Sequence, residues 1–81
     1  MLLGDINNDG SIDSIDATLI LSDYADLAVG KATSFNAEQA KAADVNGDGK
    51  YDSIDASLIL AYYSHIQTGG TGTIENYIKS N

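Results

Sequence analysis

Two stretches of twelve residues, 39 positions apart, hold most of the acidic side chains of this 81-residue chain. They cover residues 5–16 and 44–55, and each contains four of the 12 acidic residues. Comparing residues 5–30 with residues 44–69 gives 14 identities in 26 positions, where chance would give about one or two. The chain is therefore predicted to contain two copies of one unit, a polar loop followed by an amphipathic segment.

The amphipathic segments have the spacing of helices, because apolar residues recur three and four positions apart after each acidic loop. The predicted core positions are Ala17, Ile20, Leu21, Tyr24 and Leu27 in the first repeat and Ala56, Ile59, Leu60, Tyr63 and Ile66 in the second. Gly30 and Gly69 follow the last apolar positions and are predicted to end the two helices. Asn36 and Gln39 form a capping-box pattern before a short linking helix. Residues 74–78 are expected to form a further helical turn.

The composition limits how such a small chain can be stabilised. The net charge is −8, and 43% of the residues are hydrophobic, with one Phe and no Trp. The absence of Cys excludes disulfides, zinc–thiolate sites and thiol catalysis. Small domains usually need a stabilising feature besides the core, and without Cys a structural metal held by oxygen ligands is the simplest one that remains. The acidic balance argues against nucleic acid and anionic membrane surfaces as partners, and no apolar run reaches the roughly 20 residues of a membrane span.

Each loop follows the pattern D-x-N-x-D-G-x-(apolar)-D-x-x-D, which is typical of a calcium-binding loop. Side chains at positions 1, 3, 5, 9 and 12 and the backbone carbonyl of position 7 are expected to hold the ion, while glycine at position 6 allows the sharp turn. The predicted ligands are Asp5, Asn7, Asp9, Ser11, Asp13 and Asp16 in loop 1 and Asp44, Asn46, Asp48, Lys50, Asp52 and Asp55 in loop 2. Position 8, Ile12 or Tyr51, is expected to point inward and to pair the loops. Two calcium ions are therefore predicted.

Several features differ from an ordinary EF-hand. Only residues 1–4 precede the first loop here, so an entering helix is not expected, and position 12 is Asp instead of the usual Glu. Calcium sensors expose a groove rich in Met, whereas this chain has only Met1. Three alternatives remain open: an EF-hand-like calcium buffer or sensor, a purely structural calcium-stapled linker, and two solvated acidic turns.

The repeat pair resembles a dockerin module over about residues 4–70. The segments Asp44-Val45-Asn46-Gly47-Asp48-Gly49-Lys50 and Asp55-Ala56-Ser57-Leu58-Ile59-Leu60 carry the resemblance, and the residues from Tyr62 to Gly70 are similar to dockerins of gut and rumen fibre-degrading bacteria. The resemblance implies an all-α fold of two calcium-binding loop–helix repeats, related by a pseudo-twofold axis and joined by a short linking helix. One domain is expected over residues 1–81, with repeat 1 at about 5–30, the linking helix at about 36–43, repeat 2 at about 44–69 and a tail at 70–81.

The resemblance also implies a function: calcium-dependent binding of a cohesin module, which anchors a secreted polysaccharide-degrading enzyme or scaffold protein in a cellulosome-type complex outside the cell. The implied partner contacts on the first helix are Ser14, Ile15, Thr18, Leu19 and Ser22, and those on the second are Ser53, Ile54, Ser57, Leu58, Ala61, Tyr62 and His65. Ile15 and Ile54 fall outside the predicted core positions, which suits a partner surface. Leu19 and Leu58 are either partner contacts or simply buried. Because the two faces are nearly equal, a partner could bind in either of two orientations.

Catalysis is not expected, and neither is a small-molecule substrate. The clustered carboxylates are already assigned to metal loops, and His65 is the only histidine. Ser14 and Ser53 lack a nearby base and the glycines of a nucleophile elbow. Residues 69–72 are glycine-rich, but no Gly-Lys-Ser/Thr sequence follows, so a phosphate-binding loop is not predicted.

Overall fold

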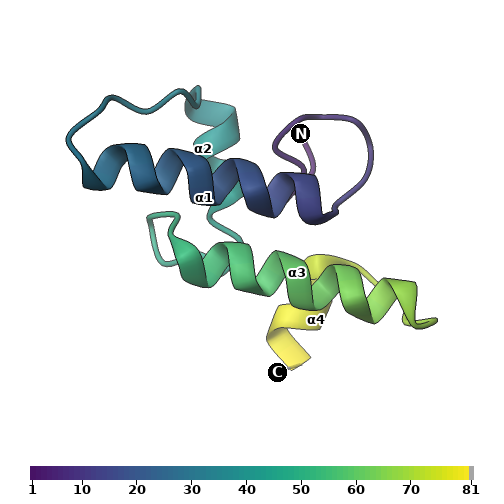
Figure 1. Ribbon diagram of the computed structural model, residues 1–81. Coiled ribbons are helices and arrows are strands. Elements are labelled where there is room, and N and C mark those ends of the chain that lie inside the picture. Colours follow the sequence, from purple (N-terminus) through teal and green to yellow (C-terminus); the bar gives the residue numbers. More distant parts are fainter. Residues whose placement is uncertain (81) are drawn as a thin grey trace.

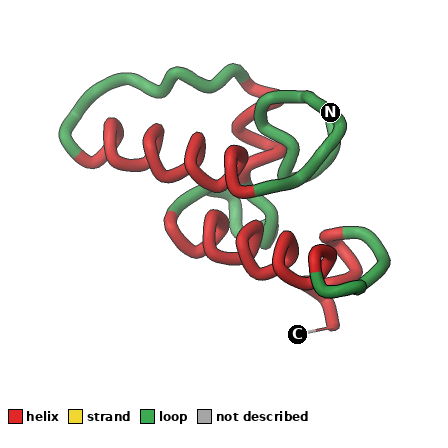
Figure 2. Tube along the Cα trace, turned by 45° about the vertical axis from the view of Figure 1, so that its right-hand side comes forward, coloured by secondary structure: helices red, strands yellow, loops and turns green. Residues whose placement is uncertain are grey.

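Two antiparallel helices form the centre of the protein. The structure is a computed structural model and describes residues 1–80. Within that range the elements are α1 (Ser14–Ala28), α2 (Ala37–Ala43), α3 (Ser53–Gln67) and α4 (Ile74–Ser80), and no strand is present. Helices α1 and α3 pack side by side and run in opposite directions, so their preceding loops lie at opposite ends of the pair (Figures 1 and 2). This arrangement confirms the predicted all-α fold of two loop–helix repeats.

Local sequence signals set the helix ends. Asp13 and Asp52 are the N-caps of α1 and α3, and each accepts a hydrogen bond from a backbone N–H in the first turn. Gly30 and Gly69 follow the C-caps with φ angles of 86° and 94°, a left-handed conformation that costs glycine little. Both glycines therefore end the helices as predicted.

The shorter helices follow each repeat. The predicted capping box of α2 is confirmed, because Asn36 and Gln39 exchange side-chain to backbone hydrogen bonds of 2.8 and 3.0 Å. Helix α4 confirms the predicted helical turn in the tail, and its Ile74 is buried. Helix α2 lies beside α1, and α4 packs against α3 (Figure 1). No helix within residues 1–80 is long and apolar enough to cross a membrane.

The hydrophobic core is small, and its composition corrects part of the sequence prediction. Among the residues that the structure describes, ten hydrophobic residues are buried, and four of them are alanines. The predicted core residues Ala17, Ile20, Ala56 and Ile59 are among them. The prediction is wrong for Leu21, Tyr24, Leu27, Leu60 and Ile66, which are all exposed, and Tyr63 is only partly buried. The buried side of each long helix is completed by different residues, Asp23 in α1 and Tyr62 in α3.

The expectation that position 8 pairs the two loops is also wrong. The loops lie at opposite ends of the helix pair (Figure 1), and Ile12 and Tyr51 contact different segments. Ile12 lies close to Gly4, as does Ile74 of α4. The Tyr51 ring packs against Phe35, with 5.2 Å between ring centroids. Position 8 therefore connects each loop to a segment outside it.

Candidate calcium centres

The first loop brings three carboxylates to one point. Carboxylate oxygens of Asp5, Asp9 and Asp16 lie within 4.8 Å of one another. Asp5 and Asp16 are buried, whereas Asp9 is exposed on the open side. The Asp5 carboxylate accepts hydrogen bonds from the backbone N–H groups of Asp9 (3.2 Å) and Gly10 (3.0 Å). Loop positions 1, 5 and 12 thus converge as the calcium-loop pattern predicts.

The second loop repeats this geometry. Oxygens of Asp44, Asp48 and Asp55 also lie within 4.8 Å of one another. Asp44 accepts hydrogen bonds from the backbone N–H groups of Asp48 (3.2 Å) and Gly49 (2.9 Å), the same two loop positions as before. Both position-6 glycines have positive φ, 89° at Gly10 and 95° at Gly49, which a residue with a Cβ rarely adopts. The sharp turn in each loop therefore depends on glycine.

Position 12 has two structural roles in each repeat. Asp16 is the third residue of α1, and one of its oxygens accepts the backbone N–H of the N-cap Asp13 at 3.0 Å. Its other oxygen accepts the N–H groups of Ile6 (2.9 Å) and Asn7 (3.3 Å) at the start of the loop. A capping box usually uses Glu or Gln at this position. The shorter Asp is long enough here because the loop and the first helical turn lie in direct contact.

Burial perturbs the acidity of the position-12 carboxylates. Burial raises the pKa of Asp16 above its ordinary value, although backbone hydrogen bonds oppose the change. Burial raises the pKa of Asp55 to about 6, with the charges of Asp52 and Asp44 adding to the effect. Asp55 lacks one donor that Asp16 has, because the Val45 N–H bonds the carbonyl of Ala43 instead. A cation among these carboxylates would favour their charged forms.

The remaining predicted ligands lie in the same two loops, but Asp13 and Asp52 are not part of the two clusters of carboxylate oxygens. Asn7 donates a side-chain hydrogen bond to Asp9, and the side chain of Asn46 accepts the N–H of Asp48. Asp13 and Asp52 use one oxygen each to cap their helices. At position 7, Ser11 and Lys50 donate their backbone N–H groups to Asp9 and Asp48 respectively. Carboxylate and amide oxygens make both loops a donor set that suits calcium.

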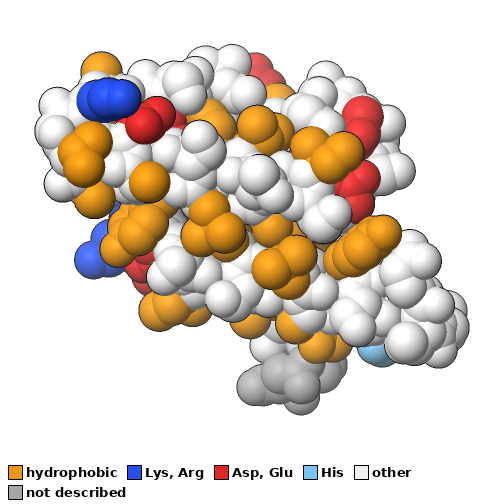
Figure 3. Space-filling view, viewed as in Figure 1, with side chains coloured by type: hydrophobic (Ala, Val, Ile, Leu, Met, Phe, Trp, Pro, Cys, Tyr) orange, Lys and Arg blue, Asp and Glu red, His pale blue; other side chains and the backbone are white. Residues whose placement is uncertain are grey.

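The predicted partner contacts form an open surface on α1 and α3. The exposed residues of this set are Ser14, Ile15, Thr18 and Ser22 on α1 and Ser53, Ile54, Ser57 and Ala61 on α3. Ile15 and Ile54 are 55% and 58% exposed, large values for apolar side chains. Leu19 and Leu58 are only partly buried, with one side against the core. Figure 3 shows hydrophobic side chains gathered on the face where these two helices lie side by side.

Two residues of the predicted contact set are held by the tail. Tyr62 is 8% exposed, and its hydroxyl donates a 2.6 Å hydrogen bond to the carbonyl of Gly72, so the structure does not place it on an open surface. His65 is partly buried and packs against Tyr77 of α4 at 4.9 Å between ring centroids. Periodicity could not reveal either contact, because it carries no information on where the tail folds back.

Sequence reasoning missed two exposed leucines on the same helices. Leu21 and Leu60 are 41% and 43% exposed and occupy equivalent positions of the two repeats. Leu21 is seven residues beyond Ser14 and three beyond Thr18, so these three side chains share one side of α1. The signal that could have found them is the pairing of each leucine with small hydroxyl residues at helical spacing.

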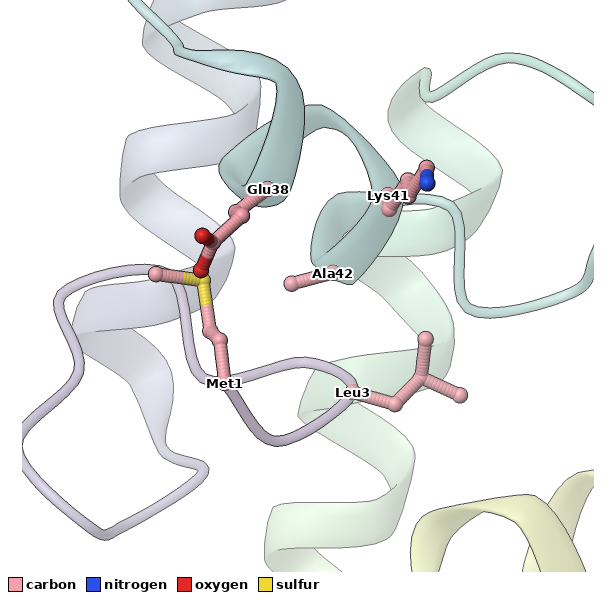
Figure 4. A pocket seen from close by; sticks show the side chains of 5 residues that line it. All are labelled: Met1, Leu3, Glu38, Lys41 and Ala42. Carbon is pink, nitrogen blue, oxygen red and sulfur yellow. The ribbon is translucent and has the colours of Figure 1, made fainter.

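The hollow beside the N-terminal segment has no catalytic arrangement. It has a volume of about 310 Å³ and is lined by Met1, Leu3, Glu38, Lys41 and Ala42 (Figure 4). The Glu38 and Lys41 side chains point in different directions, so no acid–base pair converges there. This hollow adds no reason to expect catalysis.

Two antiparallel loop–helix units, each with an acidic cluster of oxygen donors, define a small calcium-binding module of the EF-hand-like class. The sequence matches the family model described as Dockerin type I domain over residues 3–63, and the chain belongs to this family. A search of curated proteins gives no match. Dockerin domains bind calcium, dock to cohesin modules in a calcium-dependent manner and occur in extracellular proteins; they are docking modules, not catalytic ones.

Proposed function

We propose that this chain anchors a secreted polysaccharide-degrading enzyme or scaffold protein in an extracellular multi-enzyme complex by binding a cohesin module. The observation that carries the proposal is the repeated combination of an acidic loop with an exposed apolar helix face. Family membership supports cohesin as the partner class. We further propose that the whole chain, 1–81, acts as one docking domain.

Two calcium ions are proposed as cofactors, one in each loop. The proposed ligands are the twelve residues at positions 1, 3, 5, 7, 9 and 12 of the two loops. The convergence of three carboxylates in each loop supports one ion at each centre. Two ions would offset half of the net charge of −8. When bound, calcium would draw each loop onto the first turn of its helix, because position 12 belongs to both.

The proposed docking surface consists of the exposed residues of α1 and α3 together with Leu21 and Leu60. Its members are Ser14, Ile15, Thr18, Leu21 and Ser22 on α1 and Ser53, Ile54, Ser57, Leu60 and Ala61 on α3. Leu19, Leu58 and His65 are partly buried and could contribute their exposed parts. Tyr62 is left out because it is buried. Small hydroxyl and apolar side chains without charge suit a partner surface that loses water on binding.

Binding to a panel of cohesin modules tests this proposal. The chain is titrated with each cohesin by calorimetry in calcium, and the titrations are repeated with excess chelator. We expect at least one cohesin to bind in calcium and none to bind in chelator. Calcium uptake without binding to any cohesin would instead support the calcium buffer or sensor.

A further inference from the structure

Asp23 is a buried carboxylate that neither calcium loop uses. It lies on the inner side of α1 and is 2% exposed. Thr33 donates to it at 2.7 Å, and Ser34 donates both its N–H at 2.8 Å and its hydroxyl at 2.9 Å. The hydroxyl of Tyr51 donates a fourth hydrogen bond. The carboxylate is thus held by two segments that lie outside its own helix.

These donors keep Asp23 charged. Burial alone would raise the pKa of Asp23, but the hydrogen bonds from Tyr51, Ser34 and Thr33 together lower this pKa to about 2. A buried charge loses much of its stabilisation when a donor is removed, because water cannot replace it. Each of the three donor residues therefore contributes to keeping α1 and the following segment together.

Tyr51 connects this charge to the second calcium loop. It is position 8 of that loop, between Lys50 at position 7 and Asp52 at position 9. Its ring packs against Phe35, while its hydroxyl reaches Asp23. One side chain of loop 2 thus contacts both α1 and the segment before α2. The Tyr51 hydroxyl also lies 2.8 Å from the hydroxyl of Thr33. Within residues 1–80, loop 2 has no hydrogen bond to α1 or to residues 31–36 apart from these two contacts of Tyr51.

The corresponding junction of the other repeat lacks this polar contact. A shift of 39 residues relates Ile12 to Tyr51 and Asp23 to Tyr62. Ile12 and Tyr62 line one hollow, but Ile12 has an apolar side chain that cannot donate a hydrogen bond. The Tyr62 hydroxyl donates instead to Gly72, which holds the tail. The two repeats are therefore similar in sequence but differ in how each loop meets the opposite helix.

We propose that Tyr51 and Asp23 form a latch that couples calcium binding at loop 2 to the ordering of residues 31–36 and the C-terminal end of α1. Calcium fixes positions 7 and 9 of the loop, and these flank Tyr51 on both sides. A fixed Tyr51 holds Asp23 and, through it, Thr33 and Ser34. Because coupling is reciprocal, an ordered latch also strengthens calcium binding at loop 2. The latch uses the second proposed calcium site but does not require cohesin.

Replacement of Tyr51 by phenylalanine tests the latch, because Tyr51→Phe keeps the ring and removes the hydroxyl. The full chain is titrated with calcium while NMR follows the amide signals of Gly10 and Gly49, which report on loops 1 and 2 separately. We expect calcium affinity at loop 2 to fall by about fivefold or more, with a smaller change at loop 1. Amide hydrogen exchange over residues 31–36 should become faster in calcium.

Three further variants separate coupling from a general loss of stability. Asp23→Asn changes no proposed calcium ligand, yet it should also lower the calcium affinity of loop 2. Tyr24→Phe, on the exposed side of α1, should change neither loop. Tyr62→Phe should speed exchange in residues 71–79 and leave residues 31–36 unchanged. The latch is overturned if Tyr51→Phe binds calcium like the unmodified chain. It is also overturned if calcium affinity falls equally at both loops and hydrogen exchange becomes equally faster at all amides. Neither result depends on whether any cohesin binds.

Discussion

Single aspartates have more than one function in this protein. Asp16 and Asp55 accept backbone hydrogen bonds that join the start of each loop to the first turn of the following helix. The same carboxylates belong to the acidic clusters that could hold a cation. Every buried side-chain polar atom within the described residues has a hydrogen-bond partner, so the acidic clusters do not leave orphaned groups. Substitution at position 12 therefore affects metal binding and helix initiation together. Substitution at position 1 is expected to affect metal binding without removing the N-cap of the following helix.

The first prediction concerns position 1. Asp5→Ala removes a charged ligand from loop 1 without removing a capping side chain. Asp44→Ala does the same in loop 2, because Asp44 caps the C-terminus of α2 only through its backbone N–H. Calorimetry should show two calcium ions bound to the unmodified chain and about one to each variant, with the altered site weakened by more than about 100-fold, since even outer-shell changes cost 10–100-fold. Asp26→Ala, on the surface beside Lys31, is the control and should keep both sites. Two full-strength sites in Asp5→Ala would contradict the ligand assignment.

The second prediction concerns pH. Asp55 has a pKa of about 6 in the folded chain, above its ordinary value of 3.8, so without calcium the folded state binds more protons between these pH values. In chelator, helix content by circular dichroism should therefore fall as pH rises from about 4 to 6. Protons and calcium compete for this carboxylate, so calcium affinity at loop 2 should fall as pH drops below about 6.

The pH prediction has an internal check at Asp23. Its pKa of about 2 lies below the ordinary value of 3.8, so its contribution to stability is complete above about pH 4 and is lost only as pH falls toward 2. Asp23 therefore cannot produce a change between pH 4 and 6. Helix content that increases with pH across that window, in chelator, would show that burial of Asp55 is not the dominant effect.

At the scale of the elements, the helices depend on the loops. In the described part of the chain the core holds ten hydrophobic residues, four of them alanine, and the sequence has no Cys for a disulfide. Isolated 15-residue helices are marginal in water, and α1 and α3 have that length. Repulsion among the carboxylates adds to the cost of closing each loop. The metal is thus expected to contribute a large share of the folding free energy.

The third prediction follows from this dependence. Excess chelator should remove most of the helical circular dichroism signal near pH 7, and calcium should restore it. Magnesium should restore less, because it requires a stricter octahedral geometry at shorter distances. A chain that keeps its full helix content in chelator at pH 7 would show that the core alone supports the fold.

The elements were predictable where the signals are local. Caps and positive-φ glycines act within a few residues, so the ends of α1, α3 and the α2 capping box follow directly from the sequence. The convergence of positions 1, 5 and 12 was also predictable, because loop spacing fixes it. The buried side of α1 was not predictable in full, because Leu21 and Tyr24 have helical spacing but are exposed. Asp23 could not be recognised as buried, because its partners lie 10, 11 and 28 residues away.

At the scale of the whole molecule, the two repeats present similar surfaces in an antiparallel arrangement. Exposed residues of the sequence Ser-Ile-x-x-Thr on α1 match Ser-Ile-x-x-Ser on α3. A twofold rotation that exchanges the repeats would therefore present nearly the same exposed side chains to a partner. The surfaces differ at their edges, where Asp26 lies near Lys31 in one repeat and His65 packs against Tyr77 in the other. The difference in chemistry at Asp23 and Tyr62 is hidden, because both residues are buried.

The last prediction tests whether a cohesin uses both surfaces. Ile15→Asp with Ser22→Asp places charges on one side of α1, and the mirror variant Ile54→Asp with Ala61→Asp does so on α3. All four positions are exposed, so the fold and both calcium sites should be kept, whereas Leu19 and Leu58 are avoided because they pack against the core. A charge buried without a partner in an interface is costly.

If either surface can serve, each double variant should keep binding within about tenfold, because the partner rotates to the intact helix. The fourfold variant should then lose binding while retaining two calcium ions by calorimetry. We expect the α3 surface to be the stronger of the two, because the α1 surface ends at the charged Asp26 and the α3 surface ends at aromatic His65 and Tyr77. If one double variant alone abolishes binding and its mirror has no effect, the partner uses a single fixed orientation, and the sequence similarity of the two surfaces reflects the repeat alone.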